Sequence, residues 1–150
     1  MENFESLNLS PELIKGLNKQ DIKTPTEIQY KVFPLALENK DIIGQSHTGS
    51  GKTLAYLLPL FEKIDVKKKE MQSIILTPTV ELAMQVEKQI KLLSSNSLIP
   101  VTSITIIGKV NIKKQIEKLR EKPHIIVGTT GRMFELIKLR KINTQTVRTN

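Results

Sequence analysis

The chain of 150 residues is long enough for one compact domain, and 39% hydrophobic residues are sufficient for a core. The absence of cysteine excludes disulfides, thiolate metal sites and a cysteine nucleophile, and no apolar run approaches the ~18 residues of a membrane-spanning helix. The 23 Lys and Arg against 15 Asp and Glu give a net charge of +8, which favours a polyanionic partner such as nucleic acid. The acidic N-terminus carries no secretory signal, so we expect a cytoplasmic protein.

Two short helices are predicted before residue 41. The Ser10-Pro11 pair predicts a helix that runs to about residue 17, with the serine as its N-cap. Thr24 and Glu27 have the spacing of a capping box, which predicts a second helix.

From residue 41 onward, predicted strands alternate with predicted helices. Strands are expected at 41–45, 73–77, 101–107 and 124–128, and helices at 52–63, 80–93, 112–121 and 132–140. This alternation predicts an α/β protein with a parallel sheet flanked by helices. Because ligands bind beyond the carboxyl ends of such strands, the loops after residues 45, 77 and 128 are expected to share one edge.

The most informative motif is the glycine-rich loop after the first predicted strand. Residues 46–53 read Ser-His-Thr-Gly-Ser-Gly-Lys-Thr, which matches the phosphate-binding P-loop except that Ser46 stands at its first glycine. Loop N–H groups and the helix dipole favour a triphosphate, Lys52 would reach its β- and γ-phosphates, and Thr53 would bind Mg²⁺. The alternative is a glycine-rich turn that opens an ordinary helix.

Several motifs in order give the chain a resemblance to DEAD-box ATP-dependent RNA helicases. Phe4 and Gln29 are spaced as in the Q motif of that family, and residues 45–53 and 77–85 resemble its motifs I and Ia. Gly108 falls in the position of a Gly-Gly pair, and residues 129–132 resemble motif Ib. The resemblance implies an incomplete RecA-like P-loop NTPase fold, with a Q-motif helical region at 1–40 and part of the first ATP-binding domain at 41–150.

The resemblance implies ATP and Mg²⁺ as cofactors. The amide of Gln29 can accept from the adenine N6–H and donate to N7, a pair of groups that guanine does not present. The implied nucleotide-binding residues are Phe4, Ile22, Gln29, Thr48, Gly49, Ser50, Gly51, Lys52 and Thr53, with Lys52 and Thr53 also catalytic and Thr53 on the metal. The alternative is structural, with Phe4 as a hydrophobic staple and Gln29 on the surface.

The resemblance also implies RNA, bound through its sugar-phosphate backbone without regard to sequence. The implied contact residues are Pro78, Thr79, Glu81, Gly108, Thr129, Gly131 and Arg132. Alternatives are a plain N-cap at Thr129 and a structural ion pair at Arg132. The residues that depart from the family pattern lie mainly in the motifs assigned to RNA, where Val80 replaces Arg, Lys109 replaces Gly and Thr130 replaces Pro. We therefore expect nucleotide affinity to be better preserved than RNA affinity.

The acidic D-E-A-D motif of the family does not occur in the sequence, which ends about where the strand leading to that motif would begin. The intact enzyme of the family would couple ATP hydrolysis to local unwinding of RNA duplexes, whereas this chain is expected to bind ATP and hydrolyse it very slowly at best. The alternative functions are a truncated, non-catalytic nucleotide- and RNA-binding fragment and, from another class, a small-molecule kinase. Because the remainder of the helicase core is missing, we expect exposed strand edges, an uncovered apolar face and marginal stability or pairing with another chain.

Overall fold

The computed structural model describes residues 3–47 and 51–147. The chain divides into two compact units. Unit 1 comprises Met1–Ile64 and Leu93–Ile99, and unit 2 comprises Asp65–Leu92 and Pro100–Asn150. The expected division into a helical region at 1–40 and part of an ATP-binding domain at 41–150 stays a prediction. No helix in the described ranges is long and apolar enough to cross a membrane.

Unit 1 is helical. Its helices are α1 (Pro11–Lys19), α2 (Glu27–Leu37) and α3 (Lys52–Lys63), together with the last turn of α4. The predicted Ser10 cap of α1 is confirmed, since its hydroxyl accepts from the Leu13 N–H. The core of this unit contains Phe4, Leu13, Leu17, Phe33, Leu57 and Leu58.

The capping box of α2 lies two residues later than the sequence predicts. Its N-cap is Thr26, whose hydroxyl accepts from the Gln29 N–H, and the Gln29 side chain bonds back to the Thr26 N–H. The expected Thr24 box is therefore wrong, because the amide that closes the box lies three residues after Thr26. The carboxylate of Glu27 instead pairs with Lys31 at 2.7 Å on the exposed face of the helix.

The strand predicted at 41–45 does not form. Residues 40–47 have no regular secondary structure, and Ile43 is 100% exposed. A strand is stabilised by hydrogen bonds to its neighbours, and the described sheet lies entirely in unit 2 and includes no strand from this run. The apolar run therefore stays irregular and exposed.

Unit 2 is built on a parallel three-stranded sheet with the order β1-β3-β2. The strands are β1 (Ser73–Thr77), β2 (Ser103–Ile106) and β3 (Ile125–Thr129). Thr77 pairs with Thr129 and Ile106 with Gly128, so the carboxyl ends of the strands meet at one edge. Gly128 permits this pairing, because a Cβ there would lie 2.2 Å from the Ile106 carbonyl oxygen.

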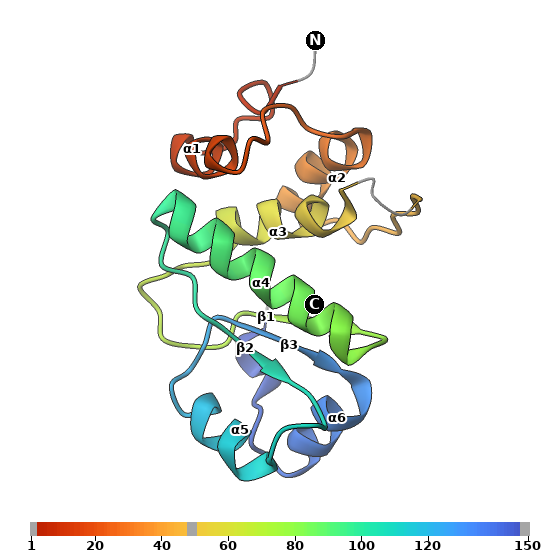
Figure 1. The fold of residues 1–150 in the computed structure, drawn as a ribbon, viewed down its shortest axis with the longest axis vertical. Coiled ribbons are helices and arrows are strands. Elements are labelled where there is room, and N and C mark those ends of the chain that lie inside the picture. The colour runs from red at the N-terminus through yellow and green to blue at the C-terminus, as the bar shows by residue number, and fades with distance from the viewer. Residues whose placement is uncertain (1–2, 48–50, 148–150) are drawn as a thin grey trace. The chain divides into compact units, whose positions relative to one another are not determined.

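Helices cover both faces of this sheet, which confirms the predicted α/β class. Figure 1 shows α4 (Val80–Ser97) on one side, and α5 (Ile112–Leu119) and α6 (Thr130–Lys138) on the other. The core beneath α5 and α6 contains Ile106, Ile126, Met133, Leu136 and Ile142. After α6, the described chain ends with a short 3-10 helix at Thr144–Thr146.

Strand β1 is an edge of the described sheet, which confirms the expected exposed strand edge. Its pairing partner is β3, and no strand among the described residues pairs with its other side. Leu76 on this strand is 55% exposed. The edge offers unpaired backbone groups beside an apolar side chain, an arrangement that promotes association between strands.

Candidate functional site

Gln29 links the start of α2 to the start of α3. Its side chain is buried, with 3% exposure, so the surface alternative for this residue is wrong. Its Oε1 accepts from the Thr26 N–H at 3.0 Å, and its Nε2 donates to the Gly51 carbonyl at 3.1 Å. These partners fix the orientation of the amide, because one is a donor and the other an acceptor. Beyond these two bonds, the amide has one N–H and one lone pair without a partner among the described residues.

Gly51 begins α3 in a conformation that favours glycine. Its φ is 86°, and a Cβ would lie 2.5 Å from the Gln29 Nε2 and 3.0 Å from the Thr26 Oγ1. No side chain in the described part of unit 1 caps this helix. Its first backbone N–H groups therefore remain suited to an anion.

Lys52 and Thr53 follow directly in the first turn of α3. The exposed Lys52 side chain donates from Nζ to the Ser46 carbonyl at 2.6 Å, which holds its ammonium group against the loop. Thr53 lies one helical turn before Tyr56, and burial raises the pKa of the tyrosine above its usual value. The other predicted loop residues, Thr48, Gly49 and Ser50, lie outside the described residues.

Phe4 and Ile22, the other two residues predicted beside the adenine, lie close to α1. Phe4 is 1% exposed and belongs to the core of unit 1. Ile22 is half-buried, and its N–H bonds the Leu17 carbonyl behind α1. Of the predicted adenine-side residues, Gln29 is the one with a direct hydrogen bond to the start of α3.

Unit 2 brings the predicted RNA-side residues to the edge where its strands end. Thr79 caps α4, since its hydroxyl accepts from the Leu82 N–H at 3.1 Å, and Pro78 beside it is exposed. Glu81 in the first turn of α4 lies 3.8 Å from the ammonium group of Lys109, in the loop after β2. Both side chains are exposed, so the pair contributes little to stability, but it connects the two segments.

The start of α6 lies at the same edge, directly after the carboxyl end of β3. Thr129 is the N-cap of α6, but its hydroxyl makes no capping bond. A Cβ on Gly131 would meet nothing within 4 Å, and the same is true of Gly108 in the loop after β2. Arg132 lies 3.5 Å from the Glu135 carboxylate, which supports the ion-pair alternative, and it also donates to the carbonyls of Gly108 and Val110.

Gln115 is the residue that sequence analysis missed. It is 1% exposed and bonds both the Ile107 carbonyl and Arg132. The available signal was its position on the inward-facing stripe of α5, between Ile112 and Leu119, where an apolar residue is expected.

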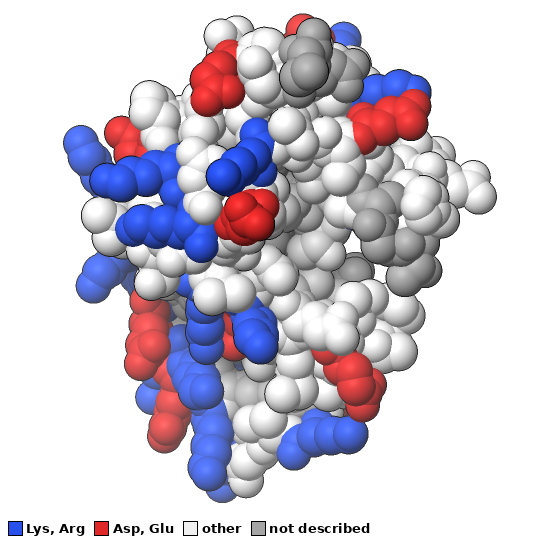
Figure 2. All heavy atoms as spheres, turned by 45° about the horizontal axis from the view of Figure 1, so that its top comes forward, with Lys and Arg blue, Asp and Glu red and all other residues white. Residues whose placement is uncertain are grey.

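Positive charge is concentrated in unit 2. This unit contains sixteen of the 23 Lys and Arg but seven of the 15 Asp and Glu, whereas unit 1 contains seven basic and eight acidic residues. Figure 2 shows Lys and Arg gathered along one side of the face in view. In the described residues, no group of three or more His, Asp or Glu could hold a metal ion. The charge distribution therefore favours a polyanion at unit 2.

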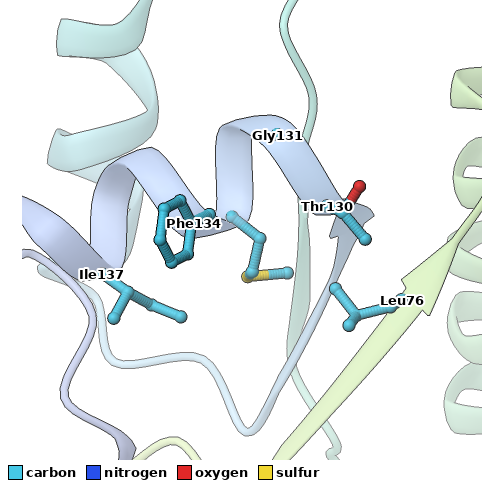
Figure 3. Close-up of a pocket in the computed structure, with 6 residues that line it drawn as sticks. Leu76, Thr130, Gly131, Phe134 and Ile137 are labelled. Atoms are coloured by element: carbon cyan, nitrogen blue, oxygen red, sulfur yellow. The ribbon is translucent and has the colours of Figure 1, made fainter.

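An apolar groove of about 430 Å³ adjoins the start of α6. Figure 3 shows Leu76 of β1 facing Phe134 and Ile137 of α6, with Thr130 and Gly131 at the end of the groove. Met133 also lines it. The groove is the uncovered apolar face that the sequence predicts beside the free edge of β1.

Comparisons with known proteins agree with this arrangement. A family model described as DEAD/DEAH box helicase matches residues 26–149. The DEAD-box ATP-dependent RNA helicase CshC of Bacillus cereus is 40% identical over 142 residues, which is 95% of this chain and 36% of the relative. The probable ATP-dependent RNA helicase YfmL of Bacillus subtilis is 45% identical over 132 residues, which is 88% of this chain and 35% of the relative.

A solved structure shows the same fold. The crystal structure of a DEAD box protein from the hyperthermophile Methanococcus jannaschii matches with a TM-score of 0.90 and 37% identity, over 98% of this chain and 40% of that one. This chain therefore spans 36% and 35% of the length of the two named helicases and 40% of the solved structure.

Proposed function

This chain belongs to the DEAD/DEAH box helicase family, and we propose that it supplies the ATP-binding part and a share of the RNA-binding part of an ATP-dependent RNA helicase. In the whole helicase, ATP hydrolysis would be coupled to local unwinding of RNA duplexes. The two ligands are assigned to different units, ATP to unit 1 and RNA to unit 2.

The link between Gln29 and Gly51 is the observation that carries the ATP assignment. It holds a carboxamide at the start of α3, next to the segment that resembles a phosphate-binding loop, and this amide can make one further donor bond and one further acceptor bond. The free acceptor suits the adenine N6–H, and the free donor suits N7. The uncapped start of α3 would bind phosphates with the ammonium group of Lys52, which would leave the Ser46 carbonyl to do so.

The residues present fit Mg²⁺ bound together with the nucleotide. Mg²⁺ usually keeps several waters and is held by few protein groups together with substrate phosphates, which agrees with the absence of a His, Asp and Glu cluster in the described ranges. Thr53 would supply the protein ligand through its hydroxyl. The ion would neutralise charge on the phosphates.

The RNA assignment rests on the strand-end edge of unit 2. Hydroxyl and backbone groups suited to phosphates and riboses lie at this edge. They belong to Thr79, Gly108, Thr129 and Gly131, and Pro78, Glu81 and Arg132 lie beside them. The excess of basic residues in this unit would attract the RNA backbone from solution.

Calorimetry tests the ATP assignment, and a fluorescent single-stranded oligouridine tests the RNA assignment. We expect Mg-ATP to bind more tightly than Mg-GTP, and RNA affinity to fall steeply with salt. Equal affinity for the two nucleotides would favour a different P-loop enzyme. Because the sequence contains no Asp-Glu-Ala-Asp run, phosphate release with and without RNA would separate an active ATPase from a module that binds both ligands without turnover.

A further inference from the structure

Gln115 is a buried polar side chain with a partner at each end. It lies on the core-facing side of α5, and its Nε2 donates to the Ile107 carbonyl at 2.6 Å. Its Oε1 accepts from Arg132 Nη1 at 3.0 Å. A buried amide with both ends satisfied holds its partners in one geometry, because any shift leaves a buried polar group without a bond.

Arg132 extends this network around the loop between β2 and α5. Its Nη1 also donates to the Val110 carbonyl at 3.0 Å, and its Nη2 donates to the Gly108 carbonyl at 3.2 Å. The Nε lies 3.5 Å from the Glu135 carboxylate, and the arginine side chain is only 15% exposed. The guanidinium is therefore directed mainly at protein acceptors.

The clamped carbonyls determine where the loop amides point. In a trans peptide, the C=O of one residue and the N–H of the next point in opposite directions. Because the carbonyls of Ile107 and Gly108 are bound by Gln115 and Arg132, the N–H groups of Gly108 and Lys109 point away from the clamp. Neither N–H has a protein acceptor in the described part of unit 2, and the outer side of Gly108 is open.

The loop has little other support. Its internal backbone bond, from the Val110 N–H to the Ile107 carbonyl, is long at 3.4 Å. The ion pair between Lys109 and Glu81 is exposed and 3.8 Å long. Without Gln115 and Arg132, the peptide planes at Gly108 and Lys109 would be free to rotate.

We infer that Gln115 and Arg132 form a clamp that holds the loop at residues 107–111 so that the adjacent N–H groups of Gly108 and Lys109 face an RNA phosphate. The inference rests on the proposed RNA-binding function of this edge. Gln115 is a positioning residue in this account, and Arg132 acts chiefly through the loop rather than as a charge on the phosphate. Two neighbouring amides turned the same way form an anion-binding concavity.

Two variants of the full chain separate these roles. Gln115→Leu removes both amide bonds while keeping the size of the side chain, and Arg132→Lys keeps the charge while removing the planar fork. The matched controls are Gln145→Leu and Arg120→Lys, at exposed positions of the same unit. Circular dichroism would verify folding of each variant.

The first readout is backbone order in the absence of RNA, from ¹⁵N relaxation at Gly108 and Lys109. We expect order parameters typical of rigid backbone, about 0.85, in the parent chain and in the controls, and values below about 0.6 in both variants. Unchanged order parameters at Gly108 and Lys109 in the two variants would contradict the proposal that Gln115 and Arg132 hold this loop.

The second readout is affinity for a fluorescent oligouridine at several salt concentrations, with Mg-ATP affinity measured alongside. We expect Gln115→Leu and Arg132→Lys each to weaken RNA binding by about tenfold, with Mg-ATP affinity unchanged. Full RNA affinity in Arg132→Lys would show that the charge alone matters and would overturn the clamp. No RNA binding by the parent chain would instead refute the proposed function, and the inference with it.

Discussion

The substitution Gln29→Glu separates the two hydrogen bonds of the Gln29 amide. A carboxylate can still accept from the Thr26 N–H, so the capping box of α2 is retained. It cannot donate to the Gly51 carbonyl, which is bound at 3.1 Å in the parent chain, nor to adenine N7. The change therefore removes the link to α3 and one of the two proposed adenine contacts, with almost no change in shape.

The burial of the Gln29 side chain determines how much stability and Mg-ATP affinity the substitution should remove. The side chain is 3% exposed, so the change leaves a buried carbonyl opposite a carboxylate, which costs more in the free energy of unfolding than the about 1–3 kcal/mol of a neutral unsatisfied group. Loss of one base contact in the same site is worth about 1.4 kcal/mol, which is tenfold in affinity. We expect Mg-ATP binding to weaken by at least this factor.

Urea unfolding and calorimetry with Mg-ATP measure both effects. The matched control is Gln85→Glu, an exposed position on α4 that makes the same chemical change and is expected to alter neither quantity. RNA affinity, assigned to unit 2, is also expected to stay constant. The reasoning is refuted if Gln29→Glu binds Mg-ATP within twofold of the parent chain.

Three further predictions concern unit 2. Gly128→Ala should destabilise the chain by more than about 3 kcal/mol in urea unfolding, because its Cβ would lie 2.2 Å from the Ile106 carbonyl oxygen; a cost below 1 kcal/mol would contradict the sheet pairing. Burial lowers the pKa of His124, so in acid the unfolded chain binds more protons than the folded chain. The free energy of unfolding should therefore fall as the pH drops below about 6.5, and His124→Asn should remove this pH dependence. If the chain pairs with another copy through the β1 edge, Leu76→Lys should reduce the dimer fraction in sedimentation velocity. An unchanged dimer fraction would contradict pairing through this edge.

Local signals in the sequence predicted much of the fold. The limits of α3 match the prediction of 52–63, and the Ser10 cap is confirmed by its side-chain hydrogen bond. These features depend on residues within one or two helical turns, which the sequence displays directly. The parallel sheet also followed from the alternation of strands and helices.

One failure was local, since the capping box of α2 uses Thr26 and Gln29 in place of Thr24 and Glu27, and the others involve partners that are distant in sequence. The apolar run at 41–45 has the composition of a strand, but a strand forms only beside another strand. Gln115 carried a local signal, as a polar residue on an apolar stripe, but its partners lie in another helix and a loop. The contact between Gln29 and Gly51 joins residues 22 positions apart, so no local pattern reveals it.

The most direct test of the central claim is calorimetric titration of the parent chain and Lys52→Ala with Mg-ATP and Mg-GTP. If the start of α3 binds phosphates and Gln29 recognises adenine, the parent chain will bind Mg-ATP more tightly than Mg-GTP, and Lys52→Ala will lose both by tenfold or more. Absence of heat with Mg-ATP, or Mg-ATP affinity that is unchanged in Lys52→Ala, would contradict the account.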